Sequence, residues 1–216
     1  GIFTVKQGVA VHNFNWNEVK KHLPKINKQV AKEALDNTRV QQEWDNLLST
    51  HFSQSFDSFV RKNSVNQLVN VWQDLGKNVQ HLAPVSKAYI QVLAKQKQLK
   101  HIEQVLLQEE KTHDELWLLD NLRACYASMQ RVHMDQLFIQ LQKKMKKQQS
   151  TQYENKSLLA AYAYLAAGQK DNQLAKQALE QVIYTAPNKQ DSILYANVLA
   201  ELGEIRHSLD VYQKLN

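Results

Sequence analysis

The stretch that decides the fold lies near the C-terminus, where LLAAYAYLAAGQKDNQLAKQALEQVIYTAPN (158–188) is followed by ILYANVLAELGEIRHSLDVYQKLN (193–216). Each segment has apolar residues at helical intervals, a short polar break, and then a second helical stretch. Overlaying the two segments places Gly168 and Gly203 at the end of the first helix of each pair. The positions that then match in the second helix are Ala175 with Ser208, Leu179 with Tyr212, and Val182 with Leu215. The sequence therefore predicts a repeated helix hairpin.

The rest of the chain has the same helical periodicity, and strand-like alternation is absent. Only five Gly and three Pro occur in 216 residues, which leaves little turn chemistry for a sheet of many strands. We therefore predict an all-α protein. Pro24 and Pro84 are predicted to begin helices, and Gly76 to end one. The predicted helix pairs are 85–111, 113–149, 153–186 and 189–215, within a repeat region 81–216 that is continuous with less regular helical hairpins over 1–80.

The terminal pattern resembles the tetratricopeptide repeat of about 34 residues. It has a small residue where paired helices touch, a larger apolar residue one turn later, and Pro187 after the second helix. It departs from that family in lacking the signature Trp, and Ala161 and Ala196 stand near the place where Gly is usual. The resemblance implies a right-handed superhelical stack of antiparallel helix hairpins, an α-solenoid whose first helices line a concave surface for a protein partner.

A second resemblance is more specific. The stretch LVNVWQDLGKNVQHLAPVSKAYIQVLAKQKQLKHIEQVLLQEEKTHDELWLLDNL (68–122), the terminal residues 159–182 and 194–215, and FNWNEVKKHLPKINKQ (14–29) are similar to the repeat region of the HemY family. That resemblance implies a protein of the bacterial inner membrane, associated with late protoheme synthesis. It also implies anchoring through segments that this sequence does not contain, with the repeats facing the cytoplasm.

The predicted function is a non-catalytic scaffold for protein partners, with late haem-synthesis enzymes implied by the resemblance. Nucleophile elbow, P-loop, kinase and Gly-rich dinucleotide motifs are missing, so we predict no enzyme. The net charge of +6 comes without a nucleic-acid-binding signature, so we predict no nucleic-acid partner. Two alternatives remain open: a haem- or porphyrin-binding carrier, and a peptide-binding repeat module unrelated to haem.

Partner contacts are predicted at exposed positions of first helices. These positions are Lys87, Gln91, Asp120, Arg123, Tyr162 and Asn197. The densest basic run, at 143–147, is predicted to be a solvated helix C-terminus, where cations are favoured. In a membrane-tethered protein it could also contact anionic lipid.

No metal site is predicted, because no two of the eight His are four residues apart and a lone Cys cannot complete a zinc site. No cofactor is predicted either, although axial haem ligation needs only one suitable side chain, and His81 is the candidate. Cys125 lies on an apolar helical stripe and is predicted to be a small buried hydrophobe.

The acidic pair Glu109 and Glu110 is expected in a solvated turn between helices, which argues against general acid–base work. Thr112 or Asp114 is predicted to cap the following helix. The aromatic stripe of Phe52, Phe56 and Phe59 is predicted to be core.

Overall fold

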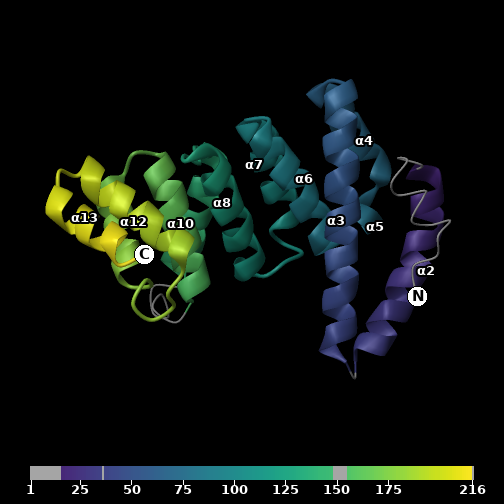
Figure 1. Cartoon of the computed structure of the whole chain (residues 1–216), viewed down its shortest axis with the longest axis horizontal. Helices are drawn as coiled ribbons and strands as arrows, with labels where there is room; N and C mark the ends of the chain where they lie inside the picture. The colour runs from purple at the N-terminus through teal and green to yellow at the C-terminus, as the bar shows by residue number, and fades with distance from the viewer. Residues whose placement is uncertain (1–15, 36, 148–154, 216) are drawn as a thin grey trace. The chain divides into compact units, whose positions relative to one another are not determined.

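The computed structural model describes residues 16–35, 37–147 and 155–215, and these residues form helices and connecting turns without a strand (Figure 1). The all-α prediction is confirmed. The helices are α2 (Trp16–Ala34), α3 (Thr38–Lys62), α4 (Val65–Leu75), α5 (Lys77–Gln80), α6 (Ala83–Lys95), α7 (Leu99–Glu109), α8 (Glu115–Met129), α9 (Asp135–Lys147), α10 (Lys156–Gly168), α11 (Asn172–Glu180), α12 (Lys189–Glu201) and α13 (Ile205–Gln213).

The chain divides into two compact units, Gly1–Gln96 and Lys97–Asn216. The sequence predicts a boundary between residues 80 and 81, where less regular hairpins give way to regular repeats. That boundary stays a prediction. Every predicted helix pair from 85 onward contains two described helices.

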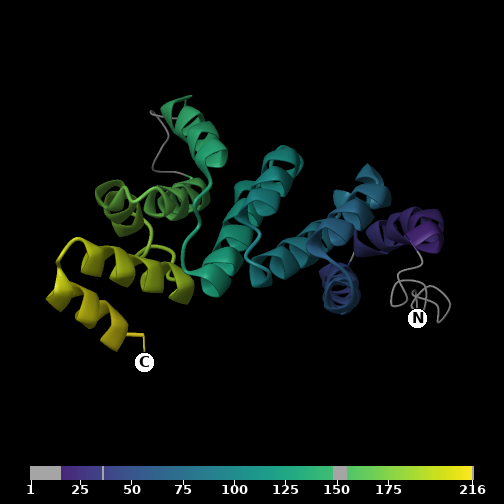
Figure 2. The same ribbon diagram turned by 90° about the horizontal axis from the view of Figure 1, so that it is seen from above.

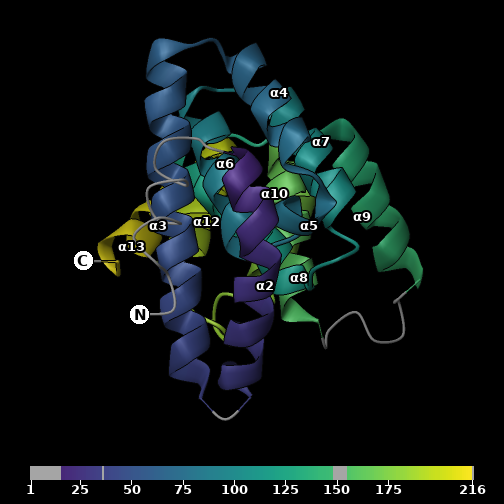
Figure 3. The same cartoon turned by 90° about the vertical axis from the view of Figure 1, so that its right-hand side faces the viewer.

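The first unit has an aromatic core on the long helix α3, which packs against α2, α4 and α6. Figure 3 shows α2 and α3 side by side. Phe52 and Phe56 are fully buried, and the Phe56 ring meets the edge of Tyr89 at 5.7 Å between centroids. Tyr89 in turn stacks on Trp72 at 4.2 Å. The prediction of an aromatic core on α3 is confirmed for Phe52 and Phe56, whereas Phe59 is half-buried.

Pro24 lies inside α2 and does not begin it, so that prediction was wrong. A proline in a helix interior costs roughly 3 kcal/mol because it removes one backbone hydrogen bond and crowds the preceding turn. Leu23 and Ile26, on either side, are 3% and 8% exposed. Their burial holds the helix together across the proline. Pro84 does stand in the first turn of α6, and Gly76 does end α4 at φ +78°.

Six of the twelve helices in the described residues begin at a local side-chain cap. Ser64 and Gln67 form a reciprocal capping box at α4. The other residues whose side chains accept a first-turn backbone N–H are Asn37, Asp114, Asn155, Asp171 and Asn188. The prediction that Asp114 caps a helix is confirmed.

A repeated turn geometry follows three of the helices. The helices α6, α10 and α12 each contain 13 residues. In each case the residue two positions after the helix has positive φ, and the next helix begins two residues further on; these residues are Lys97, Lys170 and Gly203. With Gln130 after α8, these positive-φ positions from Lys97 onward follow one another at intervals of 33, 40 and 33 residues.

The overlay of Gly168 on Gly203 is therefore out of register. Gly203 matches Lys170, because both take the left-handed conformation in the turn, while Gly168 is the last residue of α10. Gly168 is required for another reason. A Cβ placed on it would lie 1.9 Å from the carbonyl oxygen of Val132, in the connection between α8 and α9. Only glycine lets that backbone approach so closely.

In the second unit, α10 is the central helix and packs against α8, α9 and α11. The last two helices follow in order, with α12 against α11 and α13 against α12 (Figure 2). α9 also packs against α7, and Glu103 of α7 accepts the backbone N–H groups of Gln136 and Leu137 in the first turn of α9.

Candidate functional site

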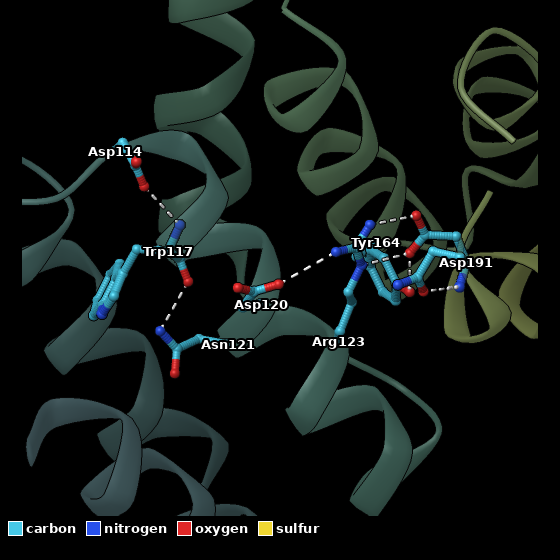
Figure 4. Close-up of polar contacts among 8 residues, drawn as sticks. Asp114, Trp117, Asp120, Asn121, Arg123, Tyr164 and Asp191 are labelled. Atoms are coloured by element: carbon cyan, nitrogen blue, oxygen red, sulfur yellow. Dashed lines mark hydrogen bonds and ion pairs between the residues drawn. The ribbon is translucent and has the colours of Figure 1, made fainter. Parts of the chain in front are cut away.

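Three helices of the second unit meet at a buried ionic cluster of Arg123 on α8, Tyr164 on α10 and Asp191 on α12 (Figure 4). Asp191 is 2% exposed. Arg123 donates to it twice, from Nε at 2.9 Å and from Nη2 at 2.7 Å, and the Tyr164 hydroxyl donates to Oδ1 at 2.7 Å. This bidentate pairing fixes the guanidinium plane relative to the carboxylate.

Local structure places the carboxylate. Asn188 caps α12 by accepting the backbone N–H of Asp191, so Asp191 stands in the first turn of that helix. A carboxylate there is also favoured by the partial positive charge of the helix N-terminus. Tyr164 is held edge-on to Tyr126 of α8 at 5.6 Å between centroids.

The cluster changes the proton affinity of its members. Burial, together with the nearby Asp191 charge, raises the pKa of Tyr164 well above the usual tyrosine value. The hydrogen bond to Asp191 raises the pKa of Arg123. Both effects favour the neutral phenol and the charged guanidinium seen in this arrangement, so the cluster keeps its hydrogen bonds across the physiological pH range.

Arg123 also reaches the molecular surface. Its Nη1 lies 3.2 Å from Oδ1 of Asp120, whose side chain is 46% exposed, while the Arg123 side chain is 19% exposed. One edge of the guanidinium therefore lies in the buried cluster and the other faces the side on which Asp120 meets solvent.

A pocket of about 290 Å³ opens beside Arg123. We call it the Arg123 pocket; its lining residues are Leu116, Leu119, Arg123, Lys156, Ser157, Ala160, Val182, Ala186, Pro187, Asn188 and Asp191. Leu119, Ala160 and Val182 are each 2% exposed and give it an apolar floor, whereas Leu116 is 49% exposed at its edge. An apolar floor with a few polar groups at the rim is the usual character of a recognition pocket.

A second polar network joins α8, α12 and α13. The Asn197 side-chain amide donates to the Tyr126 hydroxyl at 2.6 Å, and the Tyr212 hydroxyl donates to the Asn197 carbonyl oxygen. Burial raises the pKa of Tyr126. The small cavity next to this network is about 70 Å³, which gives it room for water.

The six predicted contact residues fall into different environments. Asp120 and Arg123 lie together at the rim of the ionic cluster, and Asn197 lies in the second network. Tyr162 was expected to be exposed, but it is 8% exposed and stacks on Phe138 of α9 at 5.4 Å, because α9 covers that side of α10. In the first unit, Lys87 is exposed on α6 and Gln91 is half-buried.

The sequence did not identify Tyr164 and Asp191 as members of the cluster. Asp191 could have been placed in a first turn from the Asn188 cap three residues before it. Tyr164 stands in an apolar run that predicted only core. Nothing local indicates that both side chains reach Arg123, since Asp191 is 68 residues away along the chain.

The acidic pair is not in a solvated turn, so that prediction was wrong. Glu109 is 0% and Glu110 is 5% exposed. Helix α9 accounts for the burial of Glu110, whose carboxylate accepts from Lys144 Nζ at 3.0 Å and from the Gln140 amide. Lys144 of the basic run is therefore engaged within the protein, while its neighbours Lys143, Lys146 and Lys147 are exposed.

Within the described residues, no three His, Cys, Asp or Glu side chains lie close enough together to share a metal ion. His81, the haem-ligand candidate, is half-buried at the C-terminal end of α5. Cys125 is 0% exposed, which confirms the prediction of a buried hydrophobe, and burial raises its pKa to about 12. None of the described helices has the length and apolarity that crossing a lipid bilayer requires.

Comparison of the chain with models of known protein families, with curated proteins and with solved structures finds no match.

Proposed function

We propose that this chain is a non-catalytic scaffold that binds a protein partner through the Arg123 pocket. The proposed architecture is a tetratricopeptide-like α-solenoid. The repeated turn geometry supports it, because 13-residue helices followed by a left-handed residue two positions later recur at α6, α10 and α12. The turns after α10 and α12 are 33 residues apart, close to the tetratricopeptide period of about 34, whereas the turn after α6 lies 73 residues before the turn after α10.

The observation that carries the binding proposal is the Arg123 pocket itself. First helices α8 and α10 contribute Leu116, Leu119 and Ala160 to it, and the ionic cluster holds its polar edge rigid. Its volume of about 290 Å³ suits one or two apolar side chains of a partner. Binding sites for drug-sized molecules generally begin near roughly 300 Å³ and extend to about 1,000 Å³.

The cellular setting comes from the resemblance to HemY proteins. It gives, as part of the same proposal, a protein of the bacterial inner membrane with the repeats on the cytoplasmic side and late haem-synthesis enzymes as partners. The buried Arg123–Asp191 pair holds the contact face in one conformation before a partner binds. A preformed surface loses less conformational entropy on binding, which favours recognition of a protein.

The test compares two leucine-sized side chains of equal exposure. Leu116 at the pocket edge is 49% exposed, and Ile139 on α9, outside the pocket, is 50% exposed. We expect Leu116→Ala to weaken capture of partner from a native membrane extract by about tenfold, the loss typical of an apolar anchor. Ile139→Ala should retain wild-type capture. Equal effects of the two variants would contradict the proposal.

A pocket of about 550 Å³ beside α12 and α13 favours the porphyrin carrier as a second candidate. His207 and Tyr184 line it, and both residue types can ligate haem iron. Lys189 and Lys214 at the same pocket could pair with propionates. In a titration with haem, the carrier predicts saturable binding with a shifted Soret band that His207→Ala abolishes. Loss with His81→Ala instead would place the ligand in the first unit.

The third candidate, a peptide-binding module unrelated to haem, shares the Arg123 pocket with the leading proposal. Identification of the partner separates the two, because only the leading proposal expects a haem-synthesis enzyme among the proteins that Leu116→Ala releases.

A further inference from the structure

The two cations that line the Arg123 pocket have hydrogen-bond donors that no described residue occupies. A guanidinium carries five N–H bonds, and Arg123 uses three of them, two toward Asp191 and one toward Asp120. An ammonium carries three N–H bonds, and half-buried Lys156 donates one of them to the backbone carbonyl of Gln181 at 3.2 Å. Each cation therefore has two N–H bonds left for an occupant of the pocket.

The carboxylate and carboxamide oxygens at the same pocket are already engaged. Oδ1 of Asp191 accepts from Arg123 and from the Tyr164 hydroxyl, and Oδ2 accepts from Arg123 again. The side-chain oxygen of Asn188 accepts the backbone N–H of Asp191. An occupant that brought only donors would leave the cationic donors of the pocket unpaired, so the polar edge favours an occupant that brings an acceptor.

The charges at the pocket favour an acceptor that is also an anion. Two cations and one anion, Asp191, are among the lining residues, and Asp191 is 2% exposed and paired with Arg123. The second acid that contacts Arg123, Asp120, is not among them, and its side chain is 46% exposed, so water screens its charge. The first turn of α10, which carries Lys156, adds the partial positive charge of a helix N-terminus. A carboxylate matches this edge.

The apolar part of the pocket adds a second requirement. Leu119, Ala160 and Val182 are each 2% exposed and form the floor, so an occupant must bring an apolar side chain as well as a carboxylate. Leu116, 49% exposed at the edge, continues the apolar surface beyond the floor. A chain that runs on past the pocket would cover Leu116, whereas a chain end would leave it in water. This edge favours an internal segment of a partner.

We propose that the Arg123 pocket binds an extended partner segment in which an apolar side chain of leucine size stands two residues before a glutamate. Side chains two residues apart in an extended chain point the same way and lie about 7 Å from each other. One segment thus places the apolar side chain on the floor and the carboxylate against Lys156 and the free N–H bonds of Arg123. The inference rests on the proposed function, because it names the chemistry of the segment that the same pocket recognises.

Titration of the complete chain with short acetylated and amidated peptides tests the inference, with the backbone amide signals of Ser157 and Ala160 followed by NMR. The probe is Gly-Leu-Ser-Glu-Gly, and its matched peptide has Gln in place of Glu. We expect the Glu peptide to bind about tenfold more tightly, because hydrogen bonds to a charged acceptor are the stronger ones. A peptide with Ala in place of Leu should lose about tenfold, because it leaves the floor uncovered. A chain-end peptide, acetylated Gly-Leu with a free carboxylate, should bind more weakly than the Glu peptide.

Substitution of Lys156 tests the role of its ammonium. Lys156→Met removes the charge but keeps an apolar stem, and should reduce the preference for Glu over Gln to about threefold or less. Lys156→Arg should restore the preference, and Lys143→Met, at an exposed lysine of α9, should not change it. Circular dichroism of each variant establishes that it is folded.

The outcomes separate this inference from the proposed function. Equal binding of the Glu and Gln peptides would overturn the inference and leave the Arg123 pocket as an apolar recognition site. Tightest binding of the chain-end peptide would overturn the internal segment. Binding of none of the peptides would overturn the inference and the proposed function together.

Discussion

Arg123 is the residue on which three helices of the second unit converge. Its partner Asp191 is 2% exposed. Removal of the guanidinium would leave the buried Asp191 carboxylate with the Tyr164 hydroxyl as its hydrogen-bond donor, in the first turn of the helix that Asn188 caps. Breaking a buried pair in this way is far more costly than breaking an exposed one.

We therefore expect Arg123→Ala to lower the free energy of unfolding by roughly 3–5 kcal/mol. Asp120→Ala removes only the half-exposed partner of the same guanidinium, and should cost less than about 1 kcal/mol. Urea denaturation of the two variants makes the comparison. Equal losses would show that the Asp191 pair does not hold the three helices together.

Gly168 lies where the backbone of α10 comes closest to the connection between α8 and α9. Because a Cβ would meet the Val132 carbonyl oxygen at 1.9 Å, Gly168→Ala should cost about 1–3 kcal/mol through backbone displacement. In an ordinary helix interior the same change stabilises, by roughly 0.5–1 kcal/mol. The sign of the change in urea denaturation therefore decides whether the close approach between α10 and the α8–α9 connection exists.

The sequence predicted the roles of residues whose interactions involve only their near neighbours in the chain. Asp114 caps α8 and Cys125 lies in a helical apolar stripe, and both can be predicted from a few neighbours. The burial of Glu110 could not be predicted, because Lys144, which pairs with it, is 34 residues away. Asp191 presents the same difficulty. Its position in the first turn of a helix can be predicted from the sequence, but its pairing with Arg123 cannot.

The presence of the helices could be predicted from the sequence, but the alignment of one helix hairpin on the next could be predicted less well. Hydrophobic periodicity and scarce Gly and Pro predicted helices throughout, and the described residues agree. Pro24 was misplaced because local rules ignore burial of Leu23 and Ile26. The glycine overlay failed because a lysine, Lys170, takes the left-handed position where glycine is the ordinary choice.

That lysine supplies a test of the turn geometry. Lys170 has φ +62°, a conformation that is strained for any residue with a Cβ. Lys170→Gly should raise the free energy of unfolding by about 0.5–1 kcal/mol in urea denaturation. Gln177→Gly, at an exposed position in the interior of α11, should lower it by a similar amount, since glycine destabilises a helix interior. A loss of stability with Lys170→Gly would contradict the repeated left-handed turn.

For the whole molecule, buried tyrosines couple stability to alkaline pH. Burial raises the pKa of Tyr164 and Tyr89 above the usual value of 10.0. Above that pH the unfolded chain loses phenol protons that the folded protein keeps. The unfolded state then binds fewer protons, so stability falls as pH rises past about 10, by up to roughly 1.4 kcal/mol per pH unit for each tyrosine.

The dependence of stability on pH is tested by measuring the free energy of unfolding between about pH 8 and pH 11. This range brackets the usual pKa of tyrosine. Tyr164→Phe should reduce the loss of unfolding free energy at alkaline pH by the part that Tyr164 contributes, because phenylalanine has no phenol proton to lose. A Tyr164→Phe profile parallel to the wild type would contradict the buried, protonated phenol in the ionic cluster.

Site-specific photocrosslinking tests whether the Arg123 pocket receives a protein partner. A photoreactive amino acid is placed at Leu116, at the pocket edge, or at Ile139, on α9, in the full-length protein in its own cells. We expect a discrete crosslinked partner from position 116 that is absent from position 139. The same products from both positions, or none from 116, would contradict it.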